Sequence, residues 1–314
     1  MKKNGAIVLD HGPIREPAKS SRWLSDYLSL FAFLFPALVL VAVFSIYPML
    51  YGGYLSLTNM SLTRLDYEFV GLANFEELLS RQESIEVIRR TFIYVFATIT
   101  GQFLLGFFFA LALDGIRHGR AIYGAILFLP WVFSEVVAVT SWRWILNDSF
   151  GLLNYYLGTL GISPRSWLAD PQLAMASVIM LTVWKGYPFS MVLLLAGLQT
   201  IPADLREAAR IDGASGIQIL RDIVLPTMKY VVAATIMLIT IYTFNVFSLV
   251  FAMTGGGPVR ATEILGIYMY RSAFESGRLG FGSAVAVLMF VINLAITVIY
   301  IQTVFRKSLR AGAE

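Results

Sequence analysis

Cysteine is absent from this chain of 314 residues, and histidine occurs only twice, as His11 and His118. Without cysteine there can be no disulfide bond, no iron–sulfur cluster and no zinc site built on thiolates. Two histidines leave little room for a histidine-based metal site. We therefore expect the chain to bind no metal ion.

Motifs of common catalytic sites are missing as well. The sequence contains no Gly-x-x-x-x-Gly-Lys-[Ser/Thr] phosphate loop, no His-Glu-x-x-His and no Gly-x-Ser-x-Gly. A chain without the phosphate loop does not bind and hydrolyse ATP by that route. We predict that the chain is not an enzyme, has no catalytic residue and binds no cofactor of its own.

Charged residues make up only 14% of the chain, whereas 57% are hydrophobic and the mean hydropathy is +0.70. The apolar residues form continuous runs of about 20 residues, each enough to cross about 30 Å of hydrocarbon as a helix. Continuous runs exclude a membrane barrel, whose strands alternate in polarity. The sequence thus predicts an all-α, polytopic membrane protein with six transmembrane helices, at 28–50, 91–113, 121–142, 173–198, 230–253 and 283–304.

The polar ends of the chain indicate its orientation. Residues 1–27 contain the helix-breaking pairs Gly12-Pro13 and Glu16-Pro17, and the first apolar run is too long and too far from the start for a signal peptide. Lys and Arg are more numerous in the segments on the side of the N-terminus, which places both termini in the cytoplasm. The net charge of +4 suits orientation in a membrane rather than nucleic-acid binding. We expect a cytoplasmic tail over 1–27, a six-helix transmembrane domain over 28–305 and a second cytoplasmic tail over 306–314.

Two charged residues lie near the middle of apolar runs, Glu135 in the third and Lys185 in the fourth. Each costs on the order of a few kcal/mol in lipid, so each is expected to face the interior of the helix bundle or a water-filled cavity. They either line a transport path or form a structural ion pair that joins two helices, and the sequence leaves both open. Trp131 and Phe189 could stack on a sugar ring or simply pack. Weaker polar candidates, which often only bridge helices, are Tyr242, Thr243, Asn245 and Asn293.

The polar stretch 199–229, between the fourth and fifth runs, has the pattern of two short helices on the cytoplasmic side. Asp204 can cap the first helix, with Glu207 completing an Asp-x-x-Glu capping box. Gly213 supplies a turn, and Pro226 stops or kinks the second helix. Such a segment is unlike a membrane span, so we interpret it as a surface that another protein binds.

This loop resembles a signature of the permeases of binding-protein-dependent ABC importers. In that family the last cytoplasmic loop but one contains Glu-Ala-Ala, three residues, Gly, nine residues and Ile-x-Leu-Pro. The match is complete over 20 residues and lies at the topological position that the family requires. It consists of Glu207-Ala208-Ala209, then Gly213, then Ile223-Val224-Leu225-Pro226.

The surroundings are similar to the carbohydrate-uptake branch of that family, over roughly 28–305. The stretches 195–199 (LAGLQ) and 211–215 (IDGAS) look like that branch. The stretches 254–258 (TGGGP) and 71–75 (GLANF) resemble the first permease subunit of maltose- and glycerol-phosphate-type importers. The resemblance implies the type I ABC importer permease fold, the inner membrane of a bacterium or archaeon, and a sugar or oligosaccharide substrate, with an acidic sugar as one option. A phosphorylated polyol such as glycerol phosphate, and an ion-coupled secondary transporter, are the alternatives.

The resemblance also implies partners and residue roles. Two different permeases would form a pore in membrane lipid, with two ATPase subunits that hold ATP and Mg²⁺, a periplasmic or lipid-anchored binding protein, and no nucleic acid. The stretch 199–229 would be a coupling loop that docks on the ATPase and passes its movement to the fourth and fifth spans. Its docking residues would be Glu207, Ala208, Ala209, Asp212, Gly213, Leu225 and Pro226. The substrate path would be lined by Trp131, Glu135, Lys185, Gly186, Phe189, Tyr242 and Thr243.

Overall fold

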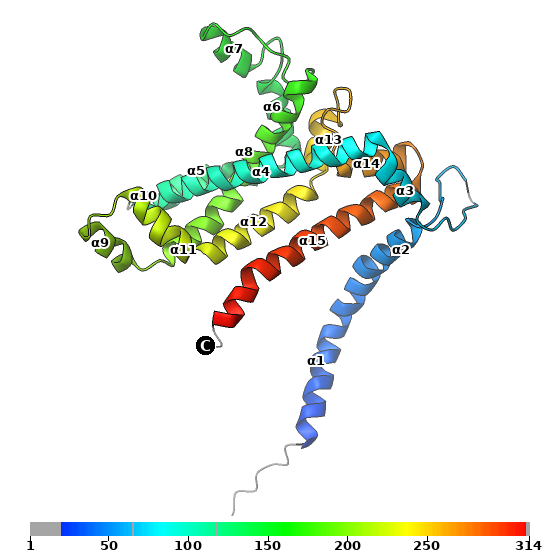
Figure 1. Ribbon diagram of the computed structural model, residues 1–314, viewed down its shortest axis with the longest axis horizontal. Coiled ribbons are helices and arrows are strands. Elements are labelled where there is room, and N and C mark those ends of the chain that lie inside the picture. The colour runs from blue at the N-terminus through cyan, green and yellow to red at the C-terminus, as the bar shows by residue number, and fades with distance from the viewer. Residues whose placement is uncertain (1–19, 65, 117, 312–314) are drawn as a thin grey trace, which may run out of the picture. The chain divides into compact units, whose positions relative to one another are not determined.

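The structure, a computed structural model, describes residues 20–64, 66–116 and 118–311. These residues form helices (Figure 1), joined by loops that contain two isolated β-bridges, Thr58↔Phe69 and Ser61↔Arg64, and no strand. The predicted all-α fold class is therefore confirmed for the part of the chain that the structure describes.

The chain divides into two compact units, residues 1–51 and residues 52–314. The described part of the first unit comprises α1 (Ser20–Val41), a π-helical turn η1 (Ala42–Ile46) and the start of α2 (Tyr47–Leu55). Helix α1 begins inside the stretch predicted as a polar tail, and residues 1–19 of that tail lie outside the described residues. At the other terminus, α15 continues to Ala311, and residues 312–314 of the second predicted tail lie outside the described residues.

Four stretches of the described residues are long and apolar enough to cross a membrane: Leu30–Leu55, α4 (Gln82–Asp114), α8 (Pro171–Gln199), and Leu279–Gln302 within α15 (Leu279–Ala311). Two further pairs of helices are long and apolar enough to cross a membrane only if the two helices of each pair are taken together, and each pair is bent. Helix α5 (Arg120–Val132) meets α6 (Glu135–Ile145) at 92°, and Gly216–Thr227 meets α12 (Lys229–Phe244) at 74°. The described residues thus contain four spans, or up to six if each bent pair is one span.

The third predicted span is not one continuous helix, which corrects the prediction for 121–142. Helix α5 ends shortly after Pro130, whose ring crowds the preceding turn and which lacks the N–H that a helix interior needs. Ser134 is the N-cap of α6, and its side chain accepts a hydrogen bond from a backbone N–H in the first turn. This bond satisfies the start of a new helix, so the chain turns instead of continuing.

The fifth predicted span, 230–253, is interrupted as well. Helix α12 ends at Phe244, and α13 (Ser248–Thr254) starts a new helix. Asn245 follows the end of α12, and its side-chain nitrogen donates to the carbonyl of Ile241 at 2.7 Å. Asparagine competes with the backbone for such hydrogen bonds and therefore favours helix ends over helix interiors.

Helices α4 and α8 pack closely, α5 and α12 lie along them, and α15 lies beside α12 (Figure 1). Glycines make the close approach possible. A Cβ added at Gly106 would lie 2.7 Å from the Cβ of Ser190, and one added at Gly101 would lie 2.6 Å from a methyl group of Val183. Small residues of this kind let membrane helices come together at short distance.

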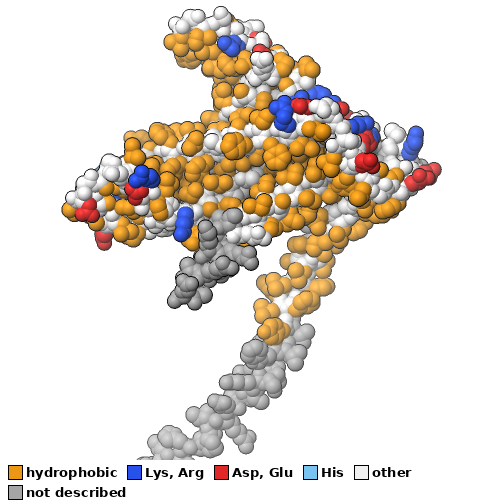
Figure 2. Space-filling view, viewed as in Figure 1, with side chains coloured by type: hydrophobic (Ala, Val, Ile, Leu, Met, Phe, Trp, Pro, Cys, Tyr) orange, Lys and Arg blue, Asp and Glu red, His pale blue; other side chains and the backbone are white. Residues whose placement is uncertain are grey.

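The surface of these helices is mainly apolar. Figure 2 shows a broad band of hydrophobic side chains, with charged side chains gathered toward its ends. Large apolar side chains such as Phe96 and Phe108 are exposed by 75% and 62%. Proteins surrounded by water rarely expose so much contiguous apolar surface, whereas helices that face hydrocarbon do.

Short helices gather at the two ends of this packing (Figure 1). One end holds α9 (Ala203–Ile211), α10 (Gly216–Ile219), a π-helical turn η2 (Leu220–Val224) and α11 (Leu225–Thr227). The other end holds α3 (Ala73–Ser80), α14 (Leu265–Tyr270) and a π-helical turn η3 (Arg271–Glu275), while α7 (Leu152–Thr159) follows α6. Ion pairs connect the segments at that second end. Arg278 pairs with Glu77, and both Arg260 and Arg271 pair with the fully buried Glu263.

Candidate functional site

A cavity of about 590 Å³ lies where the junction of α5 and α6 faces α8 and α12. Thr243, one of the seven residues predicted for the substrate path, is fully buried and is not among the lining residues. The other six all line it: Trp131, Glu135, Lys185, Gly186, Phe189 and Tyr242. The fold therefore brings predicted residues from three separate apolar runs to one place.

Lys185 reaches from α8 to the break between α5 and α6. Its Nζ donates to the carbonyl oxygen of Phe133 at 2.6 Å and to that of Trp131 at 3.4 Å. Carbonyls at the end of a helix have no partner in the next turn, and the negative end of the helix dipole attracts a cation. Lys185 thus satisfies the backbone at the point where the helix is interrupted.

Glu135 is the first residue of α6 and lies at the positive end of that helix. Its carboxylate accepts a hydrogen bond from the hydroxyl of Ser248, the first residue of α13. Among the described residues, the ion pairs within 4.0 Å do not join Glu135 to Lys185. Each charge has its own neutral partners instead, so both remain at the cavity wall without a direct bridge between the two side chains.

Gln102 lines the cavity too, although it is not among the residues predicted for the substrate path. It lies on α4, and its side-chain nitrogen donates to the carbonyl of Thr182 on α8 at 3.1 Å. A Cβ added at Gly186 would lie 2.1 Å from that nitrogen. Gly186 therefore makes room for Gln102, which was visible in the sequence as a polar residue within the run 91–113.

Aromatic rings form much of the remaining wall. The side chains of Trp131 and Tyr242 are exposed by 49% and 57%. Phe133, at the helix break, stacks on Trp184 with ring centroids 6.2 Å apart. The cavity thus combines exposed aromatic rings with an ammonium, a carboxylate and an amide, which is the mixture that orients a small polar ligand.

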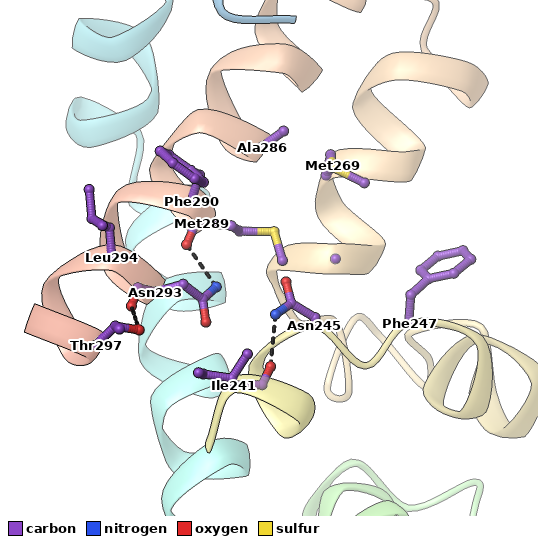
Figure 3. A pocket seen from close by; sticks show the side chains of 11 residues that line it. Ile241, Asn245, Phe247, Met269, Ala286, Met289, Phe290, Asn293, Leu294 and Thr297 are labelled. Atoms are coloured by element: carbon purple, nitrogen blue, oxygen red, sulfur yellow. Dashed lines mark hydrogen bonds between the residues drawn. The ribbon is translucent and has the colours of Figure 1, made fainter. Parts of the chain in front are cut away.

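Asn245 and Asn293 face a different space. They line a second cavity of about 470 Å³, between the end of α12, α14 and α15 (Figure 3). Each side-chain nitrogen donates to a carbonyl of its own helix, at 2.7 Å for Asn245 and 2.9 Å for Asn293. Met269, Met289 and other apolar side chains complete the wall. The two asparagines therefore do not belong to the first cavity.

The predicted docking residues lie on α9 to α11 and the turns between them. Ala209 is half-buried and packs against the apolar cluster that joins α4 and α8. Gly213 ends α9 with φ +81°, and a Cβ there would have no atom within 4 Å. The bend of 74° after Thr227 fits the kink predicted at Pro226. The remaining docking residues are exposed: Glu207, Ala208, Asp212, Gly213, Leu225 and Pro226.

The capping box predicted for Asp204 and Glu207 is wrong. The N-cap of α9 is Pro202, which has no side chain that can accept a hydrogen bond, and Asp204 already lies in the first turn. A capping box is present one helix later. The Ser215 hydroxyl accepts from the backbone of Gln218 at 3.4 Å, and the Gln218 side chain accepts from the backbone of Ser215 at 2.7 Å.

A family model and individual relatives of this chain all describe membrane components of transport systems. The family described as "Binding-protein-dependent transport system inner membrane component" matches residues 12–311. The trehalose/maltose transport system permease protein MalF of Thermococcus litoralis is 37% identical over 267 residues, which cover 85% of this chain and 90% of that protein. The sulfoquinovosyl glycerol transport system permease protein SmoG of Agrobacterium fabrum is 31% identical over 290 residues, or 91% and 94% of the two chains.

A solved structure has the same fold. In the crystal structure of a bacterial alginate ABC transporter, in complex with an alginate pentasaccharide-bound periplasmic protein, one chain superimposes with a TM-score of 0.79. The match covers 90% of this chain and 97% of that chain, at 20% sequence identity. At that identity the likeness establishes the arrangement of the helices alone.

Proposed function

The chain belongs to the family of inner membrane components of binding-protein-dependent transport systems, and on that premise we propose that it forms half of the pore of an ATP-driven importer for a sugar or oligosaccharide. It is a multi-pass membrane protein whose relatives are transport permeases. The observation that carries the substrate proposal is the cavity beside the α5–α6 break.

The chemistry of this cavity suits a saccharide. Sugars present apolar faces that stack on aromatic rings, and hydroxyl groups that need hydrogen-bond partners. Trp131 and Tyr242 supply exposed rings, while Glu135, Lys185 and Gln102 supply polar groups. The names of the two relatives, which refer to trehalose and maltose and to a sulfoquinovosyl glycerol, support the same substrate class.

Lys185 is the observation that favours an acidic substrate as the second candidate. An ammonium has three N–H donors, and two of them are used by the carbonyls of Phe133 and Trp131. One donor remains for a carboxylate or phosphate, as in an acidic sugar or glycerol phosphate. Glu135 on the same wall opposes such an anion, so we favour an uncharged sugar.

The partners follow from the family. A second permease would complete the pore, two ATPase subunits would hold ATP and Mg²⁺, and a periplasmic or lipid-anchored binding protein would deliver the saccharide. The coupling loop would dock on the ATPase with the exposed Glu207, Ala208 and Gly213. Both termini would then lie in the cytoplasm of the bacterium or archaeon.

The test uses the complete importer reconstituted into vesicles, with ATP inside and the binding protein outside. The saccharide is first identified by calorimetric titration of the binding protein. We expect saccharide uptake to require both ATP and the binding protein. The variant Glu207→Lys should abolish this uptake, although the ATPase still hydrolyses ATP. Uptake driven by an ion gradient without ATP would instead establish a secondary transporter.

A further inference from the structure

Arg206 connects the coupling loop to two helices of the membrane domain, α4 and α8. It lies on α9, and its Nη1 pairs with Oδ2 of Asp114 at the end of α4. Its Nη2 donates to the carbonyl oxygen of Leu198 at the end of α8, at 2.5 Å. One guanidinium thus spans both helix ends.

Asp114 is shared by two arginines. Its Oδ1 accepts from Nη2 of Arg120, the first residue of α5, at 3.0 Å, while Oδ2 pairs with Arg206. The Asp114 side chain is only 17% exposed. A carboxylate at the C-terminal end of a helix is repelled by the negative end of the helix dipole. The two arginines offset this repulsion and neutralise the charge of Asp114.

The rest of α9 is loosely attached. None of its residues is fully buried, and Ile211 is 86% exposed. Ala209 contributes a small half-buried methyl group to the apolar cluster. Arg206 is therefore the polar side chain of α9 that ties this helix to the ends of α4 and α8.

Those two helices also carry the cavity. Helix α8 holds Leu198 at one end and Lys185 in the cavity wall, and α4 holds Asp114 at its end and Gln102 in the wall. We propose that Arg206 is a positioning residue that passes the displacement of α9 to α4 and α8, and so to the cavity. This inference rests on the proposed function, in which the ATPase moves α9.

The test compares transport with ATP hydrolysis in the assembled importer. In Arg206→Gln, the neutral amide cannot form the ion pair with Asp114 or replace both contacts of the guanidinium. We expect the number of saccharide molecules imported per ATP hydrolysed to fall about tenfold, within the range typical of coupling between sites. The ATPase subunits should still co-purify in normal proportion, and Arg206→Lys, which keeps the charge beside Asp114, should recover part of the ratio.

Arg120→Gln is the matched control. It removes the other partner of Asp114 and leaves the contact with Arg206, so we expect lower thermal stability with an unchanged transport ratio. An unchanged ratio in Arg206→Gln would overturn the inference. So would an equal loss in Arg120→Gln, because Asp114 would then act only by holding its own helix end.

A cysteine pair gives a second test of the inference. The chain has no cysteine of its own, so Asp114→Cys with Arg206→Cys can be joined by a short bifunctional thiol reagent. We expect a low transport ratio before linking and a higher ratio after it; equal ratios would overturn the inference. Glu207→Lys separates the two proposals. If it leaves uptake intact, the assignment of the coupling loop is wrong. If Glu207→Lys abolishes uptake but the Arg206 variants keep the normal transport ratio, only the role of Arg206 is wrong.

Discussion

The ammonium of Lys185 lies 2.6 Å from the carbonyl oxygen of Phe133. A cation on α8 therefore satisfies a backbone carbonyl at the break between α5 and α6. This contact explains how a helix can be interrupted inside a membrane protein, where an unsatisfied backbone group is costly. It also places the charge at the wall of the cavity that we assign to the substrate.

Replacing Lys185 with methionine should destabilise the protein. Lys185→Met leaves the carbonyls of Phe133 and Trp131 without their donor, and an unsatisfied polar group costs about 1–3 kcal/mol. We expect a lower midpoint of thermal unfolding in detergent. Lys229→Met, at an exposed lysine outside the cavity, should leave the midpoint nearly unchanged; an equal drop in both variants would contradict the role of Lys185.

The same position tests the charge of the substrate. If the third N–H of Lys185 binds the transported solute, Lys185→Ala should weaken uptake of an acidic saccharide more than that of a neutral one. Competition between the two saccharides in vesicle uptake measures the difference. Equal effects on both would indicate that the lysine serves only the helix break.

Gly186→Ala should disturb the packing of α4 on α8. A Cβ at this position would lie 2.1 Å from the Gln102 side chain, and overpacking of this kind costs about 1–3 kcal/mol. We expect reduced thermal stability and reduced uptake. The double variant Gly186→Ala with Gln102→Ala removes the clash, so its unfolding midpoint should return toward that of the parent; a further drop would contradict this packing argument.

Gly213 should tolerate asparagine better than valine. Its φ of +81° is left-handed, a conformation that costs a residue with a side chain about 1–2 kcal/mol and that asparagine adopts more easily than β-branched residues. We expect Gly213→Val to reduce ATP-driven uptake strongly and Gly213→Asn to retain most of it. Because a Cβ there meets no atom of this chain, equal loss in both variants would point to contact with the ATPase instead of backbone strain.

Glu77 should make stability depend on pH. The hydrogen bond from Arg278 holds the pKa of this carboxyl below its usual value, against a smaller opposite effect of burial. A carboxyl whose pKa is lower in the folded state stabilises the fold at pH values above its unfolded pKa of about 4.3, and the contribution is lost as pH falls through the folded pKa. Glu77→Gln should therefore unfold at a lower temperature than the parent at pH 7, with the difference disappearing in acid.

The control for this prediction is Glu76→Gln, which alters the exposed neighbour of Glu77. It should leave the pH dependence of thermal unfolding unchanged. A persistent difference between Glu77→Gln and the parent below pH 3 would mean that Glu77 acts through packing rather than through its charge.

The location of charged residues inside apolar runs could be predicted from the sequence. A charged side chain is costly in lipid, so it must face the interior of the bundle or a cavity. Glu135 and Lys185 could be predicted in this way, and both line the cavity. The choice between Tyr242 and Thr243 could not be predicted, because neighbouring residues on a helix point in directions that differ by about 100°. Only the rotation of α12 against α8 decides that Tyr242 faces the cavity, and this rotation depends on contacts distant in the sequence.

Helix interruptions were harder to predict than helices. Pro130 was visible, but proline can end a helix or merely kink it, and the outcome here depends on Lys185 satisfying the carbonyls of the break. Likewise, Asp204 had a suitable residue three positions later, yet α9 begins at the residue after Pro202 and leaves Asp204 inside its first turn. Local patterns were therefore sufficient for element type and insufficient for element boundaries.

The glycine contacts between α4 and α8 limit where the pore can move. With Gly106 against Ser190 and Gly101 against Val183, these two helices cannot slide past each other without collisions of backbone against side chains. Opening and closing must therefore use joints elsewhere. We expect this movement at the interruption between α12 and α13, where Asn245 follows one helix and Ser248 begins the next, because Val246 and Leu249 beside it line the cavity.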